Sequence, residues 1–185
     1  LEYHKNMKDY LRSKLYLFDK LIKKKGSIVT DATLQQINKI RNISIKNNLN
    51  LNLIFNKDKG IKLISHRFLN DKQVFKIKLN NRNHKIETRV IGKIQLKNIL
   101  MAILAAKQSG IKIEKIIKVI HRIKPVEGRL EKIGKIKNYS RVILDYAHTP
   151  AALELTLLNL KEQFPSSKIS LVFGCGGERD FKKRP

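Results

Sequence analysis

The segment that constrains the fold most is Ile169–Phe173, an apolar and β-branched run that leads directly into Gly174-Cys175-Gly176-Gly177. Such a run predicts a buried strand, and the glycines predict a tight turn at its end. A helical pattern over 150–164 comes before it, and a strand is expected at 142–144 before that helix. Strand, helix, strand and glycine-rich turn in this order predict a parallel α/β layer.

The pattern before Lys124–Pro125 is different and mixes helical spacing with strand alternation. The remaining expected helices cover 5–24, 32–39, 96–109 and 113–123, and the remaining expected strands cover 27–30, 130–136 and an antiparallel run within 43–90. Asp31 is expected to cap the second of these helices. We therefore expect an α/β protein with two domains, 1–124 and 125–185. About sixty residues cannot bury a complete core, so we expect the second domain to be truncated at its C-terminus.

Composition excludes several classes of protein. No apolar run reaches the roughly 18 residues that a membrane span needs. The single cysteine, Cys175, excludes an internal disulfide framework and a CxxC zinc site. We expect a cytoplasmic monomer that does not insert into a membrane.

The net charge of +25 leaves two interpretations open. It indicates either a polyanionic partner, such as nucleic acid, or a compositional drift in which Lys, Asn and Ile are all abundant. The lysines are spread along the chain rather than gathered into an arm, and the chain has no Trp on which bases could stack. These two features favour drift.

Two glycine- or charge-rich turns are candidates for ligand binding. Bare backbone at 174–177 suits an anion, and Arg179 follows it at the carboxyl end of the expected strand. Asp145 and His148 also follow an expected strand and precede a helix, where a carboxylate can accept from ribose hydroxyls and a histidine can meet phosphate. A capping role for Asp145 is the alternative.

Two further positions carry side chains suited to a nucleotide. Arg129 lies beside Gly128 just after the expected domain boundary, where a guanidinium can clamp phosphate. Gln95 and Asn98 lie one helical turn apart, so both amides can face one ligand edge. The chain has no HExxH, no GxSxG and no complete P-loop, and no metal-ligand spacing is visible.

Six motifs occur in the same order as in one known family. They are Tyr3-His4 with Met7, Tyr10 and Lys14; Gly92 with Gln95 and Asn98; Pro125-Val126-Glu127-Gly128-Arg129-Leu130-Glu131; Asp145-Tyr146-Ala147-His148-Thr149-Pro150; Phe173-Gly174-Cys175-Gly176-Gly177-Glu178-Arg179-Asp180; and Lys183-Arg184-Pro185. On these residues the chain resembles the Mur ligases, above all the branch that adds the third amino acid to UDP-N-acetylmuramoyl-L-alanyl-D-glutamate. The resemblance spans nearly the whole chain and is weakest over 43–90.

The resemblance implies a fold and a reaction. It implies the C-terminal half of a central ATPase domain, built of helices and antiparallel strands, followed by the start of a Rossmann-like domain. It also implies ATP and Mg²⁺, with a UDP-N-acetylmuramoyl dipeptide and a diamino acid as substrates. The diamino acid is either lysine or, as we expect, meso-diaminopimelate. Without the P-loop, the fragment itself is expected to be inactive.

The resemblance also assigns roles to single residues. Lys14 matches the lysine that the family carbamylates, which turns a cation into an anionic oxygen ligand for Mg²⁺. Arg179 matches the arginine that pairs with the carboxylate of the incoming amino acid. The positions that match nucleotide contacts are Gln95 and Asn98 near the adenine, Arg129 on a phosphate, and Asp145 and His148 on the ribose and phosphates.

Two alternatives remain beside this interpretation. A folylpolyglutamate synthase-like ligase would share the architecture and the carbamylated lysine. A basic nucleic-acid-binding module is supported by net charge alone and predicts a steep salt dependence of binding. The ordered motifs favour a ligase, and Tyr3-His4 with Gly128–Glu131 favour the Mur branch, so we expect no nucleic-acid partner.

Overall fold

The computed structural model describes residues 4–56, 60–137 and 140–174. The chain divides into two compact units, each drawn from several stretches. The first comprises Leu1–Ser65, Lys76–Lys85 and Lys97–Lys118, and the second comprises His66–Phe75, Ile86–Leu96 and Val119–Pro185. The three-stranded sheet and the helix that follows it therefore contribute residues to both units.

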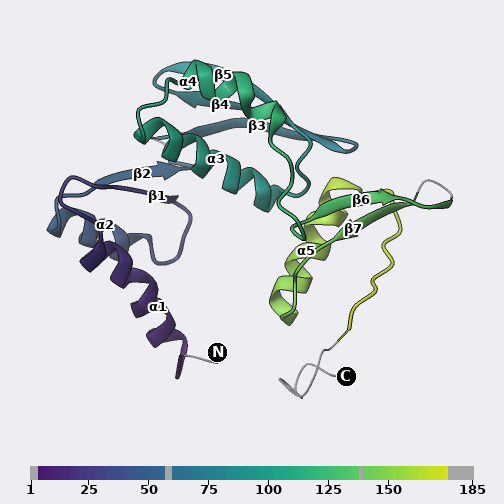
Figure 1. The fold of residues 1–185 in the computed structure, drawn as a ribbon, viewed down its shortest axis with the longest axis horizontal. Helices are drawn as coiled ribbons and strands as arrows, with labels where there is room; N and C mark the ends of the chain where they lie inside the picture. Colours follow the sequence, from purple (N-terminus) through teal and green to yellow (C-terminus); the bar gives the residue numbers. More distant parts are fainter. Residues whose placement is uncertain (1–3, 57–59, 138–139, 175–185) are drawn as a thin grey trace. The chain divides into compact units, whose positions relative to one another are not determined.

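Helix α1 (Met7–Tyr16) opens the first unit (Figure 1). Asn6 is its N-cap, because the side-chain oxygen accepts hydrogen bonds from the backbone N–H groups of Lys8 and Asp9 at 2.9 and 3.0 Å. The helix continues as a π-helical stretch, η1 (Leu17–Leu21). The helix predicted over 5–24 is thus confirmed, with bounds two to three residues inside the expected ones.

A parallel β–α–β unit follows α1. Strand β1 (Ser27–Asp31) pairs in parallel with β2 (Asn50–Ile54), and α2 (Ile37–Lys46) connects them. The buried side chains of Ile28, Ile40 and Leu49 form one core cluster, against which Leu15, Phe18, Ile22 and Leu51 pack. Figure 1 shows α2 lying along these two strands.

This β–α–β segment corrects three sequence-based predictions. The second helix covers 37–46 rather than 32–39, and the strand expected from residue 51 pairs in parallel rather than antiparallel. Ile37, Ile40 and Ile43 recur every three residues, which places them on one face of a helix but on alternating faces of a strand. Asp31 does not cap α2, because its carboxylate accepts from the N–H and hydroxyl of Thr33, both at 2.8 Å.

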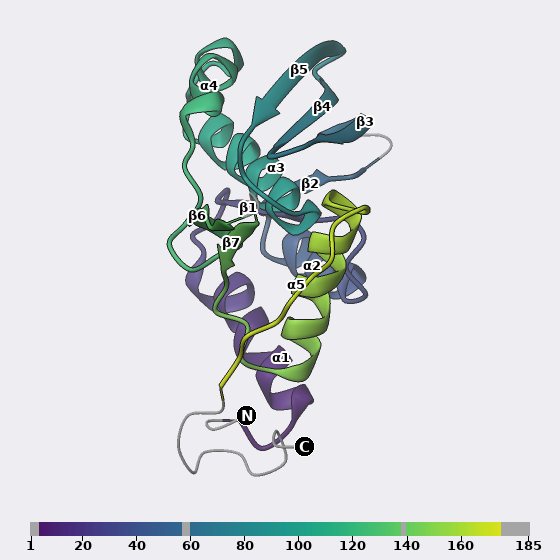
Figure 2. The same ribbon diagram turned by 90° about the vertical axis from the view of Figure 1, so that its right-hand side faces the viewer.

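The antiparallel strands predicted within 43–90 are present from residue 62 onward. β3 (Lys62–Leu69), β4 (Lys72–Leu79) and β5 (Arg82–Thr88) form a sheet in that order, and two-residue loops make neighbours antiparallel (Figure 2). Asn80 and Asn81 form the second loop with φ of 49° and 61°, as a tight hairpin turn requires. The predicted continuous alternation therefore corresponds to one sheet rather than to the whole segment.

Two helices predicted after the sheet are confirmed. α3 (Lys93–Gln108) buries Leu96, Leu100, Ile103 and Leu104, and α4 (Ile113–Val119) continues as one 3₁₀ turn, Ile120–Arg122. No helix in the described part of the chain is long and apolar enough to cross a bilayer.

The second unit contains a hairpin and a helix. β6 (Glu131–Lys135) and β7 (Arg141–Leu144) pair antiparallel, and α5 (Pro150–Gln163) follows them. Thr149 is the N-cap of α5: its hydroxyl accepts from the N–H of Ala152 at 3.3 Å, and Pro150 occupies the first turn. These two strands and this helix were predicted at nearly the same bounds.

The strand predicted at Ile169–Phe173 does not form among the described residues. This stretch pairs with no described strand, and Val172 and Phe173 are 96% and 60% exposed. An extended segment becomes a stable strand only when a neighbour satisfies its backbone groups. The strand–helix–strand order is therefore present only as far as α5, and Gly174 is the last described residue of the glycine-rich turn.

Asp71, in the loop between β3 and β4, ties this loop to the hairpin of the second unit. Its carboxylate accepts from Lys132 Nζ on β6 and from Arg141 Nε on β7, the latter at 2.5 Å. Burial would raise the pKa of Asp71, but the hydrogen bonds from Lys132 and Arg141 outweigh it and hold the pKa below its usual 3.8. The carboxylate form therefore stabilises the fold above that pH, and this stabilisation is lost as the pH falls through the folded-state pKa.

Asp71→Asn is expected to lower the free energy of unfolding by about 1–2 kcal/mol at neutral pH, since both cations keep some solvent access. Chemical denaturation of the variant and the wild type between pH 7 and pH 3 measures this difference, which should shrink at the acid end. Glu162→Gln is the matched control, because its pair with Lys93 is half exposed and should contribute less than about 0.5 kcal/mol. If the difference in free energy of unfolding between Asp71→Asn and the wild type did not change with pH, the stabilising role of the Asp71 carboxylate would be contradicted.

Candidate functional site

Two loops that are distant in the sequence, around Arg129 and around Asp145, lie together in the second unit. The backbone N–H of Tyr146 donates to the carbonyl of Gly128 at 2.8 Å, and the N–H of Leu130 donates to Asp145 Oδ2 at 2.9 Å. Glu131 closes its own loop by accepting from the N–H of Gly128 at 2.8 Å. The predicted phosphate clamp and the predicted ribose and phosphate groups thus belong to one surface.

Asp145 is the side chain that joins these loops. Besides the hydrogen bond from the N–H of Leu130, its carboxylate accepts hydrogen bonds from the N–H of Ala147 at 2.9 Å and from the hydroxyl of Thr156 at 3.1 Å. The side chain is half-buried and uses both oxygens. It does not cap α5, whose cap is Thr149, but it holds the backbone of both loops in place.

Three exposed side chains lie against one another on this surface. The Arg129 guanidinium lies 5.0 Å from the ring centroid of Tyr146, and the ring of His148 meets Tyr146 edge-on at 5.0 Å. His148 Nδ1 is also 3.0 Å from the carbonyl of Tyr146. Tyr146 is 63% exposed and was missed as a functional residue, although its place between Asp145 and His148 in an expected ligand loop was a usable signal.

The start of α3 adds Gln95 to the same surface. Gln95 Nε2 donates to the carbonyl of Arg129 at 3.4 Å. Gly92, just before α3, has φ of +86°, and a Cβ there would lie 2.6 Å from Leu130 Cδ1. Glycine therefore allows α3 to begin this close to the Arg129 loop. Asn98 is exposed one turn further along α3.

Two predicted site residues remain, Lys14 and Arg179. Lys14 is exposed in the last turn of α1, in the first unit, with Nζ 5.3 Å from the ring centroid of Tyr10. Arg179 lies outside the described residues. The structure thus brings together Gln95, Arg129, Asp145 and His148, and adds Tyr146 to them.

The chemistry of this surface suits a nucleotide better than a metal ion. A guanidinium, a histidine and an exposed aromatic ring can meet phosphate and a flat base. Within the described ranges, no group of three or more His, Cys, Asp or Glu side chains is placed to hold a metal. A lysine carbamate would offer anionic oxygens to a metal, and the exposed side chain of Lys14 has room for that modification.

Asp145→Asn separates a loop-holding role from a nucleotide role. An amide offers one acceptor oxygen where the carboxylate offers two, so either Leu130 N–H or Ala147 N–H must face an NH₂ group. We expect the free energy of unfolding to fall by about 1–3 kcal/mol, measured by thermal denaturation of the whole protein.

The control for this variant is Thr156→Val, which removes one hydroxyl donor and should cost about 1 kcal/mol. An unchanged melting temperature in Asp145→Asn would contradict the loop-holding role. A raised Michaelis constant for ATP, beyond that of an equally destabilised variant, would support a nucleotide contact as well.

The comparisons with known proteins agree on one family. The Mur ligase middle domain matches residues 1–106, and the Mur ligase glutamate ligase domain matches residues 128–185. The UDP-N-acetylmuramoyl-L-alanyl-D-glutamate–2,6-diaminopimelate ligase of Rickettsia prowazekii is 32% identical, over 100% of this chain and 38% of its own length. The chain thus spans well under half the length of this curated relative.

Solved structures show the same fold. A structure of a UDP-N-acetylmuramoyl-L-alanyl-D-glutamate–2,6-diaminopimelate ligase matches with a TM-score of 0.71 and 22% identity, over 96% of this chain and 36% of that one. A folylpolyglutamate synthetase from Lactobacillus casei matches with a TM-score of 0.64 and 19% identity, over 80% of this chain and 38% of that one. With domain matches that cover most of its length, the chain belongs to the Mur ligase family.

Proposed function

We propose that this chain is part of an ATP-dependent ligase that adds meso-diaminopimelate to UDP-N-acetylmuramoyl-L-alanyl-D-glutamate during peptidoglycan precursor synthesis. The observation that carries this proposal is the similarity, over 100% of the chain, to relatives named for that reaction. The contacts of Arg129 and His148 with Tyr146 support it, because these side chains offer a surface suited to a nucleotide.

The proposed reaction has two steps. The terminal carboxylate of the dipeptide takes the γ-phosphoryl group of ATP, giving an acyl phosphate and ADP. The amine of the diamino acid then attacks the acyl carbon, and phosphate leaves from the tetrahedral intermediate. The protein contributes by positioning these groups and stabilising charge.

Each predicted site residue has a role in this proposal. Arg129 and His148 meet the phosphates, and Asp145 holds their loops while its carboxylate lies within reach of a ribose. The adenine lies near Gln95 and Asn98, and Arg179 pairs with the carboxylate of the diamino acid. Lys14, as a carbamate, helps to hold Mg²⁺, which would offset the negative charge of the phosphates.

The proposal extends to the organisation of the protein. We place the domain boundary at Lys124–Pro125, in the interval 107–127 between the two family matches. We also propose a cytoplasmic monomer without a nucleic-acid partner.

Phosphate release by the whole protein tests the function. We expect release from ATP only when UDP-N-acetylmuramoyl-L-alanyl-D-glutamate and meso-diaminopimelate are both present. Replacing meso-diaminopimelate with L-lysine tests the amino acid, and tetrahydrofolate with L-glutamate tests the folylpolyglutamate alternative. Turnover with the folate pair and none with the UDP dipeptide would overturn the proposal.

A further inference from the structure

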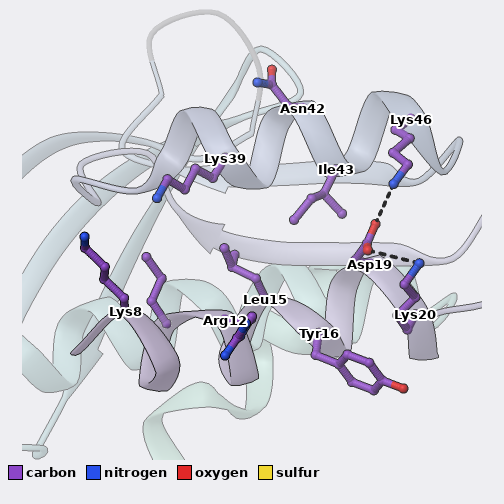
Figure 3. A pocket seen from close by; sticks show the side chains of 11 residues that line it. Lys8, Arg12, Leu15, Tyr16, Asp19, Lys20, Lys39, Asn42, Ile43 and Lys46 are labelled. Atoms are coloured by element: carbon purple, nitrogen blue, oxygen red, sulfur yellow. Dashed lines mark hydrogen bonds and ion pairs between the residues drawn. The ribbon is translucent and has the colours of Figure 1, made fainter. Parts of the chain in front are cut away.

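A groove between α1 and α2 in the first unit is not used by the proposed reaction. It is open to solvent and has a volume of about 700 Å³, which is within the size range of small-ligand pockets. Its lining residues come from α1, η1 and α2, and they are drawn in Figure 3. Lys14 does not line it, so the groove is distinct from the place of the expected carbamate.

The walls of the groove are strongly basic. Five cationic side chains and one carboxylate line it: Lys8, Arg12, Lys20, Lys39 and Lys46, against Asp19. Three of the cations are paired, since Lys20 and Lys46 each lie 3.4 Å from Asp19, and Arg12 lies 2.6 Å from Asp9. The two remaining ammonium groups, of Lys8 and Lys39, form no ion pair within the described part of the chain.

The groove therefore has two different ends. Figure 3 shows Asp19 between Lys20 and Lys46 at one end, while the ammonium groups of Lys8 and Lys39 point into the other. Lys8 comes from α1 and Lys39 from α2, so an anion between them would bridge the two helices. Two like charges facing one space repel each other, and an anion placed there relieves this repulsion.

Between the two ends the groove is apolar. Leu11 and Leu15 on α1 and Ile43 on α2 line it, and all three are only half-buried. Figure 3 shows Leu15 and Ile43 facing each other across it. An apolar body placed here would cover aliphatic surface that water otherwise contacts.

We propose that this groove binds an anionic amphiphile, with a phosphate head between Lys8 and Lys39 and an apolar body along Leu11, Leu15 and Ile43. The head belongs either to a soluble phosphate ester or to a lipid. The groove is thus a second anion-binding site, separate in the sequence from the nucleotide surface at Arg129 and His148.

Calorimetry with the whole protein tests the proposal, with excess ADP present to occupy the nucleotide site. Octyl phosphate, below its critical micelle concentration, is the probe. It should bind more tightly than butyl phosphate, and inorganic phosphate should bind least, because each buried methylene adds to affinity. The double variant Lys8→Gln, Lys39→Gln should weaken octyl phosphate binding about tenfold or more, since two charged contacts are lost.

The matched control is the double variant Lys115→Gln, Lys118→Gln. It removes the same charge from two exposed lysines of α4 and should change binding less than about twofold. Equal losses in both double variants would overturn the proposal, because net charge would then account for binding. Equal affinity for inorganic and octyl phosphate would also overturn it.

Vesicle sedimentation distinguishes the two sources of the head group. Vesicles of phosphatidylglycerol that bind the wild type but not the Lys8, Lys39 variant would assign the groove to a lipid. Binding of octyl phosphate without binding to such vesicles would assign it to a soluble ester. The measurement does not depend on turnover, so its failure is distinguishable from failure of the proposed ligase reaction.

Discussion

Lys14→Ala is expected to abolish turnover of the whole protein. In the proposed role, the uncharged amine of Lys14 adds carbon dioxide and loses a proton, giving a carbamate with anionic oxygens. Alanine removes that charge completely. A group that supplies several kcal/mol of charge stabilisation changes the rate at least roughly a hundredfold when it is lost, which steady-state phosphate release measures.

Two further readouts make this prediction specific. The intact wild type should incorporate label from ¹³C-bicarbonate at Lys14, and short carboxylates added to Lys14→Ala should partly restore turnover. Lys24→Ala is the control, since Lys24 is also exposed and follows the same helix. Undiminished turnover in Lys14→Ala, or an unlabelled Lys14 in an active enzyme, would contradict the role.

The fold was predictable where the local residue pattern alone specifies the helix or strand. The helices at α1, α3 and α5 and the bounds of strands β6 and β7 followed from apolar spacing and, for α5, from Pro150, whereas the antiparallel pairing of β6 with β7 was not predicted. The errors arose where pairing decides. Ile37, Ile40 and Ile43 suit either a helix or a strand by composition, and the helix is identified by their three-residue spacing together with the packing of Ile40 into the core.

Ile169–Phe173 shows that a strand-like pattern does not by itself form a strand. Its composition is that of a buried strand, yet no described strand lies beside it and its side chains are exposed. Strand formation depends on residues that are distant in sequence, and the apolar run alone does not specify them. The predicted parallel layer failed at this step, while the helix before it was correct.

Most residues of the candidate site could be predicted from the sequence, but their proximity on one surface could not. Arg129 was found from its place beside Gly128 after the expected domain boundary, and Asp145 and His148 were found from the loop that they share after an expected strand. Their proximity depends on backbone hydrogen bonds such as Tyr146 N–H to Gly128, which no side-chain pattern reveals. For the same reason Tyr146, whose ring lies between Arg129 and His148, was missed.

Arg179→Lys is expected to raise the Michaelis constant for the incoming amino acid strongly and to leave that for ATP nearly unchanged. A guanidinium presents two parallel N–H groups that match a carboxylate, and an ammonium cannot reproduce this geometry. The amino acid must be held by its carboxylate while its amine stays free to attack. Losing a hydrogen bond to a charged group costs about 2–3 kcal/mol, or roughly 30- to 150-fold in binding.

Initial-rate kinetics with the amino acid and ATP varied separately test this assignment. Arg122→Lys is the control, because Arg122 is exposed in the 3₁₀ turn after α4 and should leave both constants unchanged. If Arg179→Lys raises the Michaelis constant for ATP instead of that for the amino acid, the side chain binds phosphate. Because lysine keeps the charge and loses only the paired geometry, a loss confined to the amino acid would identify bidentate carboxylate binding rather than general attraction.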